Sequence, residues 1–406
     1  MNNNIDIKKE LVRIKENSLM KLNTLENHIR RDGEWDQLSV DAQRYLRIPH
    51  ILVGAVDIRA RIGTFHNPWF AKPSLLFQPP RLEFIKDSLD DLVNQRTVEL
   101  FKLAKDTKKH IIIMWSGGID STLILTSFLK NIPTADHEMI TVALTLHSIA
   151  DNPTFYFNFI SNNKKIRVIS ATELEVTNDF LNKNIILHGD PGDGILGPST
   201  GMYTKFSSSN QHLEPWKKHL KAIEEELEPT MQKFSFVQPG IGKWFTNIVV
   251  RTLEESGYAD HVSTVADWYW WTYFNFKYSS MCTYPIYHTR LKKDLEPLSI
   301  ENIEFYSKTV FYHTAKFQCW SYSNLKELVR DNVFKSYKLK AREYIYDFDK
   351  NFVYFSKKRK TSTTPPTIKK QKIPVVGYDK HFQPFGTNQL KPIFLMLLKH
   401  YKEEHP

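Results

Sequence analysis

The sequence predicts an α/β fold: a parallel sheet with helices on both faces, followed by a mostly helical region. Three observations lead to it. Short runs of β-branched and other apolar residues alternate with helix-like segments between 110 and 190. Several of these runs are apolar at successive positions, which is typical of strands buried on both faces of a parallel sheet. From about 210 the spacing of apolar residues becomes helical.

The predicted elements follow one another without an internal repeat. Residues 81–105 have apolar residues at helical spacing and lead into the first strand. Four predicted strands and one intervening helix come next: HIIIMW (110–115), the helix STLILTSFLKNI (121–132), MITVALTL (139–146), KIRVIS (165–170) and NIILHG (184–189). The most aromatic stretch, VADWYWWTYFNFKYSSM (265–281), is predicted to be helical core, with a ligand-stacking platform as the alternative.

The segments outside the sheet suggest a division into three parts. Residues 1–95 are expected to form a helical and irregular module of unknown role, because four prolines between 68 and 80 interrupt any regular element. Residues 96–345 are expected to form the main domain. Residues 346–406 are expected to be a basic mobile loop and a C-terminal segment, since the stretch 335–372 is rich in Lys and Arg and contains TTPPT.

Composition limits the class of protein. Hydrophobic residues make up 41% and aromatic residues 13% of the 406 residues, which supports a packed core and argues against disorder. The two cysteines, Cys282 and Cys319, lack a CxxC context, so we expect buried thiols and no zinc site. The N-terminus has no apolar signal region and no window is apolar enough to span a membrane, so a cytoplasmic protein is expected. The net charge of +10 is compatible with a polyanionic partner such as nucleic acid.

One short stretch, SGGIDST, carries the strongest chemical signal. It places Ser116, Gly117 and Gly118 directly after an apolar strand, and Asp120, Ser121 and Thr122 at the start of a helix. All six residues are expected to line the binding site. Glycines allow a sharp turn and a close approach of backbone to phosphate. The N-terminus of the helix then offers free N–H groups and the positive end of its dipole. A phosphate site is therefore predicted, with ordinary helix capping as the alternative.

The motif narrows the chemistry further. It is neither the Gly-x4-Gly-Lys phosphate loop nor the G-x-G-x-x-G dinucleotide pattern. SGGxDS resembles the signature of the ATP pyrophosphatase (PP-loop) superfamily, whose members cleave ATP between the α and β phosphates. This resemblance implies an adenine nucleotide alpha hydrolase-like fold and bound ATP. Asp120 would hold Mg²⁺, because a lone carboxylate would otherwise repel the phosphates.

A second loop, HGDPGDGILG (188–197), resembles the Gly-Glu-Gly-x-Asp-Glu-x-x-Gly loop of the asparagine synthetase branch. The resemblance makes Asp193 a second Mg²⁺ ligand and Asp190 a catalytic or orienting carboxylate near the attacking amine. It also implies that Met114, Leu144 and Gly189 line the adenosine through backbone atoms. A tight turn is the alternative for this loop. The loop departs from the family pattern at Asp190, Pro191 and Gly194, so the acceptor pocket is expected to differ.

A third similarity lies in KLKAREYIYDFDKNFVYFSKKRKTS, which resembles the family's late helix and the lysine-bearing loop after it. The resemblance makes Lys357 or Lys358 the cation that stabilises charge developing on the phosphates. An exposed basic linker is the alternative. The nucleophilic cysteine that heads the family's glutaminase domain has no counterpart here, because residue 2 is Asn. The amine would then come from ammonia, a separate glutaminase or an amine-bearing substrate.

Together these motifs predict an ATP-dependent carbon–nitrogen ligase. It would adenylate a small-molecule carboxylate, release pyrophosphate and form an amide with ammonia or another amine. Three alternatives stay open from the sequence alone: a PP-loop enzyme that modifies nucleic acid, an intramolecular cyclase of the β-lactam or lasso-peptide type, and a non-catalytic ATP-binding module.

Overall fold

The computed structural model describes six stretches of the chain: 80–171, 174–197, 211–232, 240–277, 298–328 and 337–358. Residues 1–79 of the expected N-terminal module, the segment from 359 onward and Cys282 lie outside these described residues. The chain divides into two compact units. The first, here the sheet unit, comprises Asp87–Gly189, Lys293–Phe311 and the chain from Lys338 onward; the second, here the helical unit, comprises the remainder.

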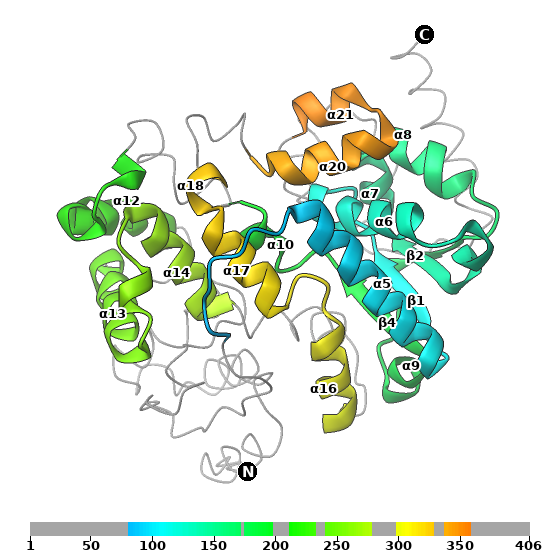
Figure 1. The fold of residues 1–406 in the computed structure, drawn as a ribbon, viewed down its shortest axis with the longest axis horizontal. Helices are drawn as coiled ribbons and strands as arrows, with labels where there is room; N and C mark the ends of the chain where they lie inside the picture. The colour runs from blue at the N-terminus through cyan, green and yellow to red at the C-terminus, as the bar shows by residue number, and fades with distance from the viewer. Residues whose placement is uncertain are drawn as a thin grey trace, which may run out of the picture. The chain divides into compact units, whose positions relative to one another are not determined.

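A four-stranded sheet forms the centre of the sheet unit (Figure 1). Its strands are β1 (His110–Met114), β2 (Ile140–Leu144), β3 (Arg167–Ser170) and β4 (Asn184–His188). They lie in the order β3-β2-β1-β4, and every pair is parallel. Parallel pairing brings the carboxyl ends of all four strands to one edge of the sheet. The predicted α/β class and parallel sheet are confirmed.

Strand β1 is covered on both of its faces. Ile111 and Ile113 are fully buried, and Ile112, which points to the opposite face, is nearly so. Ile112 packs with Ala143 of β2 and with Leu174, and Phe180 of the following helix covers the same cluster. Complete burial explains why the strand is apolar at successive positions instead of alternating with polar residues.

Helices surround the sheet within the same unit. Their bounds are α5 (Leu89–Thr107), α6 (Ile119–Asn131), α7 (Leu146–Asp151), α8 (Pro153–Phe155), a π-helical turn η3 (Tyr156–Ser161), α9 (Asn178–Lys183), α16 (Ile300–Thr309), α20 (Leu339–Asp349) and α21 (Phe352–Lys357). A 3-10 turn, η2 (Thr134–Met139), precedes β2. Helix α5 begins where the Ser88 side chain accepts a hydrogen bond from Asp91 N–H. It ends at Lys108, which adopts a left-handed conformation.

The helical unit contains no strand among its described residues, and its helices pack around aromatic side chains. Its elements are α10 (Gly192–Ile195), η5 (Gln211–Leu213), η6 (Trp216–His219), α12 (Leu220–Gln232), α13 (Ile241–Ser256), η7 (Ala259–His261), α14 (Val265–Lys277), α17 (Ala315–Ser323) and α18 (Leu325–Leu328). Trp268 and Trp271 of α14 are fully buried, and Trp270 stacks on Phe274. The described side chains of the aromatic stretch, residues 265–275, are therefore mostly core, as the sequence predicts.

Two further expectations can be compared with the structure. Residues 346–358, expected within a mobile basic loop, are instead the end of α20 and the helix α21. They are ordered because Tyr344, Ile345 and Tyr354 are buried. Cys319 is a buried free thiol, as expected. Among the described residues, none of the helices has the length and apolar character needed to cross a membrane.

Candidate functional site

The candidate site begins where β1 ends. Trp115 N–H still donates to Ala143 O of the sheet, and the chain then turns through Ser116, Gly117 and Gly118 into α6. These three residues are called the glycine loop below. Gly117 has a φ of +75°, and a Cβ at this position would lie 2.3 Å from Ser148 O. Glycine is thus required both by conformation and by space.

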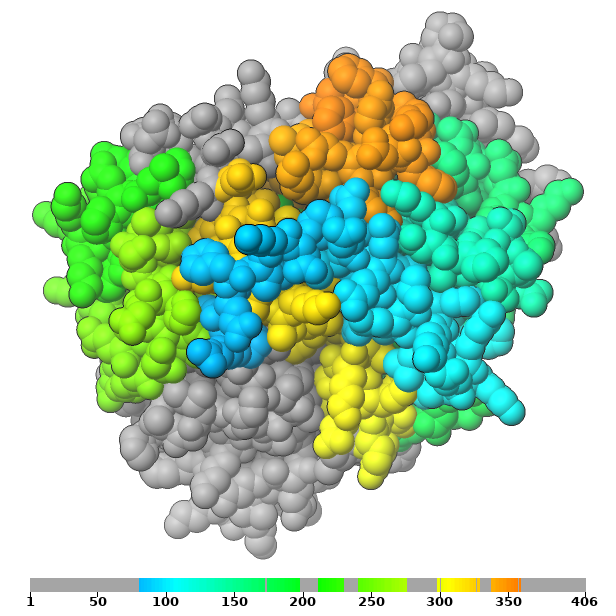
Figure 2. All heavy atoms as spheres, viewed as in Figure 1, coloured from blue at the N-terminus to red at the C-terminus, as the bar shows by residue number. Residues whose placement is uncertain are grey.

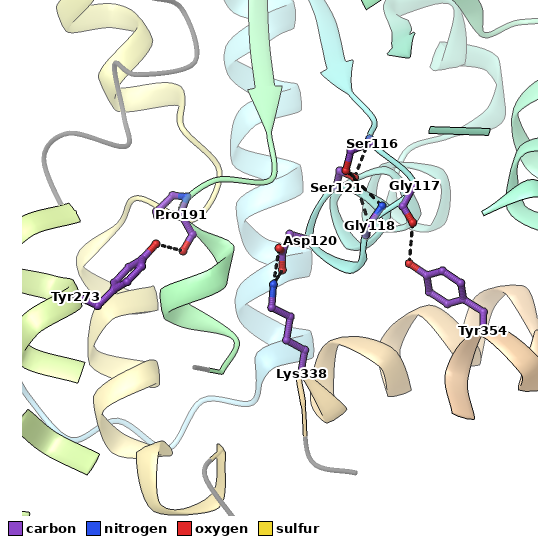
Figure 3. Close-up of polar contacts among 9 residues, drawn as sticks. All are labelled: Ser116, Gly117, Gly118, Asp120, Ser121, Pro191, Tyr273, Lys338 and Tyr354. Carbon is purple, nitrogen blue, oxygen red and sulfur yellow. Dashed lines mark hydrogen bonds and ion pairs between the residues drawn. The ribbon is translucent and has the colours of Figure 1, made fainter. Parts of the chain in front are cut away.

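Hydroxyl groups hold the glycine loop in place. Ser121 Oγ accepts a hydrogen bond from Ser116 N–H at 3.0 Å and donates to Gly118 O at 3.2 Å (Figure 3). Ser116 Oγ lies 3.0 Å from Ser121 Oγ and accepts from Gly118 N–H at 3.3 Å. Gly118 precedes the first turn of α6 and provides no side-chain cap. The start of α6 therefore keeps N–H groups and a positive dipole end directed toward the loop.

Thr122 was expected to offer its hydroxyl to the phosphate site, but it lies behind the loop. It is completely buried, and its hydroxyl accepts a hydrogen bond from Trp115 Nε1–H at 3.0 Å. This hydroxyl fixes the indole of Trp115 behind the loop. Among the expected hydroxyl donors, Ser116 is the one exposed to solvent.

The residues expected near adenosine lie at the same edge of the sheet. Met114 pairs with Ala143 and His188, at the carboxyl ends of β1, β2 and β4, and Leu144 is the last residue of β2. Gly189 follows β4, and a Cβ there would lie 3.0 Å from Asp120 Cβ and 3.1 Å from Ser121 N. The structure therefore brings Met114, Leu144, Gly189 and the glycine loop to one edge, the common position of ligand sites in parallel sheets. Their role toward adenosine stays a prediction.

The second loop belongs to the helical unit. Asp190 joins Pro191 through a cis peptide, and Asp193 lies in the single turn α10. Tyr273 OH donates to Pro191 O at 3.0 Å, and a Cβ on Gly194 would overlap the Tyr273 ring at 1.7 Å (Figure 3). Tyr273 thus leaves no room for a side chain at position 194. Because Asp120 is in the sheet unit and Asp193 in the helical unit, their pairing as metal ligands stays a prediction.

The sequence pattern did not identify the partners that α20 and α21 bring to the glycine loop. Lys338, directly before α20, places its Nζ 2.5 Å from each carboxylate oxygen of Asp120 (Figure 3). Tyr354 of α21 donates its hydroxyl to Gly117 O at 3.1 Å. Helix α20 also packs on α6, and Figure 2 shows the α20–α21 atoms (orange) closely against neighbouring parts of the sheet unit. Local sequence gives no signal for these contacts, since Lys338 lies 218 residues from Asp120.

Lys358, expected as a phosphate-binding cation, has a carboxylate partner. Its Nζ lies 2.5 Å from Asp151 Oδ1 and the side chain is almost fully buried. Burial lowers the pKa of Lys358, and the Asp151 carboxylate offsets part of that shift. Burial also raises the pKa of Tyr354 well above its usual value of 10, so its hydroxyl stays protonated as a donor. The side chain of Lys357 is outside the described part of the structure.

His188 lies at the end of β4, beside the glycine loop's strand. The side chain is buried and stacks on Tyr306 of α16 at a centroid distance of 6.1 Å. Burial lowers the pKa of His188 to about 3, so the imidazole is neutral at physiological pH. It does not add positive charge to this edge of the sheet.

The side chains around the glycine loop include oxygen and nitrogen atoms of the kinds that bind metal ions. Within the six described stretches, His, Cys, Asp and Glu side chains form no group of three or more that could hold one. Both oxygens of Asp120 contact the buried ammonium of Lys338. This arrangement does not fit a metal ion held by Asp120.

The chain was also compared with known proteins. No family model, curated protein or solved structure matches it.

Proposed function

We propose that this chain binds ATP at the glycine loop and uses it to activate a carboxylate for amide formation. The observation that carries the proposal is the conformation of Gly117. Gly117 has a positive φ, and a Cβ added to it would lie 2.3 Å from Ser148 O. Only glycine adopts this backbone conformation easily in so little space. Such a turn directly before an uncapped helix of 13 residues is suited to an anion.

The SGGxDS resemblance and the geometry of the glycine loop support the following chemistry. The substrate carboxylate would attack the α-phosphorus of ATP, forming an acyl-adenylate as the bond to the β-phosphate oxygen breaks. The exposed hydroxyl of Ser116 and the N–H groups at the start of α6 would bind the departing pyrophosphate. The amine would then attack the acyl carbon and displace AMP. An adenine nucleotide alpha hydrolase-like fold and asparagine synthetase-like catalysis are part of this proposal.

The roles of the two site lysines differ in the proposal. Lys358 forms an ion pair with Asp151, which lies next to the loop. A Cβ added at Gly117 would lie 2.9 Å from the Cβ of Asp151. We therefore assign Lys358 to bracing the loop from behind. Lys338 lies at the first turn of α6, so its charge is better placed to reach phosphate oxygens.

Product analysis tests the proposed reaction. The chain would be incubated with Mg²⁺-ATP, ammonia and a panel of amino acids and other carboxylates, and AMP, pyrophosphate, ADP and orthophosphate would be quantified. We expect AMP and pyrophosphate in equal amounts, dependent on one carboxylate. ADP with orthophosphate would overturn the proposal.

A binding measurement tests the loop itself. We expect Ser116→Ala to weaken pyrophosphate and ATP binding about 10-fold, equivalent to about 1.4 kcal/mol, with little effect on AMP. Ser356→Ala is the matched control, because that hydroxyl donates to backbone carbonyls of α21 and is not part of the glycine loop. Equal effects of both substitutions on calorimetric titrations would argue against phosphates at the glycine loop.

A further inference from the structure

Two carboxylates lie beside the glycine loop, and each of them has a buried lysine as its partner. Asp120 follows the loop in the first turn of α6, and both of its oxygens lie 2.5 Å from the Nζ of Lys338. Asp151 ends α7, and a Cβ added at Gly117 would lie 2.9 Å from its Cβ. The Oδ1 of Asp151 lies 2.5 Å from the Nζ of Lys358. The segment that carries α20 and α21 therefore supplies one ammonium group for each acid.

Burial keeps both lysines in these ion pairs. The side chain of Lys338 is 1% exposed and that of Lys358 is 7% exposed. An ammonium group removed from water is strongly destabilised unless a carboxylate or other acceptors compensate it. Separation of either pair would leave such a charge without compensation. The two ammonium groups are therefore part of the fold of the sheet unit.

The two ion pairs change the charge that an anion would meet at the loop. A carboxylate without a cationic partner would repel a phosphate group, and this repulsion is the reason that the sequence predicts a metal ion on Asp120. The Lys338 ammonium compensates that charge at both oxygens of Asp120. The Lys358 ammonium compensates the charge of Asp151. The N–H groups and the positive dipole end of α6 then favour an anion at the loop.

We propose that the glycine loop binds a phosphate or pyrophosphate group without a divalent cation on Asp120, because Lys338 provides the positive charge at that carboxylate. The resemblance to PP-loop enzymes gives Asp120 a magnesium ion, whereas both of its oxygens contact the Lys338 ammonium. Among the residues that the structure describes, His, Cys, Asp and Glu side chains form no group of three or more that could hold a metal ion. The proposed role of Lys338 rests on the proposed ATP site.

Pyrophosphate binding to the full chain tests this role. Isothermal titration calorimetry would measure binding once in excess EDTA and once in Mg²⁺, after correction for the magnesium pyrophosphate complex in solution. For the wild type we expect the two dissociation constants to agree within about 3-fold. Binding that is weaker by about 10-fold or more in EDTA would overturn the proposal, and this comparison needs no variant.

Substitutions of the ion pair separate charge compensation from structural support. Asp120→Asn removes the carboxylate charge, so we expect pyrophosphate to bind at least as tightly as to the wild type, whereas loss of a metal ligand would weaken binding in Mg²⁺. Lys338→Met leaves the charge of Asp120 without compensation and should weaken binding in EDTA by about 10-fold or more. The double variant with both substitutions removes both charges and should restore binding toward the wild type. Lys340→Met is the matched control, because Lys340 is exposed on the same helix and pairs with Glu343.

The proposed ATP site and the proposed role of Lys338 can fail separately. If the wild type binds pyrophosphate only in Mg²⁺, the ATP site stands and the role of Lys338 is wrong. The role of Lys338 is also wrong if Lys338→Met weakens binding and the double variant does not restore it, because the lysine would then only support the structure. If the wild type binds pyrophosphate under neither condition, the ATP site is wrong and the role of Lys338 falls with it.

Discussion

Replacing Gly117 by alanine is the sharpest test of how the glycine loop is built. An L-residue at its φ of +75° costs about 1–2 kcal/mol from backbone strain. The new Cβ would also lie 2.3 Å from Ser148 O and 2.9 Å from Asp151 Cβ, so one of the two segments must move. Forced rearrangements of this kind cost about 1–3 kcal/mol. We expect Gly117→Ala to lower the free energy of unfolding by about 2–5 kcal/mol.

The neighbouring glycine provides the control. Gly118 has a φ of −75°, and a Cβ there would meet only Ser116 Oγ, at 3.2 Å. That hydroxyl can rotate, so Gly118→Ala should cost less than about 1 kcal/mol, because alanine is only somewhat poorer than glycine as an N-cap residue. Urea denaturation followed by tryptophan fluorescence would measure both variants. Equal destabilisation by the two substitutions would refute the steric reasoning, and so would a Gly117→Ala protein as stable as the wild type.

Three further predictions concern buried polar groups of the sheet unit. Tyr354→Phe leaves Gly117 O without its donor and should lower the free energy of unfolding by about 1–2 kcal/mol in the same urea assay, whereas no change would show that the hydrogen bond is immaterial. Burial raises the pKa of Asp349 from 3.8 to about 6, so the folded protein binds this proton more tightly and the wild type loses stability as pH rises from about 4 to 6. Asp349→Asn keeps a side-chain oxygen that accepts from Asn351 N–H, and it should remove the loss of stability, which is about 1–2 kcal/mol after allowance for partial exposure. Melting curves at several pH values would check this prediction. A stability profile parallel to that of the wild type would contradict it. Burial lowers the pKa of His188 from 6.5 to about 3, so the contribution of the neutral imidazole to stability is complete above pH 6.5 and is lost as pH falls toward 3. His188→Gln should reduce the loss of stability at acid pH in the same melting curves. An unchanged loss of stability at acid pH would show that other groups control it.

Local sequence predicted the parts of the site that depend on neighbours in the chain. Apolar runs identified the four strands, and in β1, β2 and β4 the runs are continuous because most of their residues are buried. The strand β3 lies at one end of the strand order, is only partly buried, and contains polar residues. SGGIDST identified the glycine loop, because a tight turn into a helix has its own residue requirements. Gly189 was placed correctly at the end of β4, and its approach to Asp120 follows from parallel pairing of β1 and β4.

The contacts from the C-terminal helices could not be predicted in the same way. Tyr354 and Lys338 lie 237 and 218 residues after their partners in the loop. Nothing in KSYKLKAREY distinguishes Lys338 from the lysine two positions later, although Lys338 is buried and Lys340 is exposed. Basic composition suggested a solvated segment, whereas the fold buries one cation on Asp120 and another, Lys358, on Asp151.

These contacts link the loop to α20 and α21 from two sides. Lys338 binds the side chain of the first turn of α6, and Tyr354 binds the carbonyl of the glycine that makes the turn. The phenol can remain while a ligand binds, because it donates to Gly117 O and its high pKa keeps it protonated. We therefore expect α21 to support the loop through Tyr354.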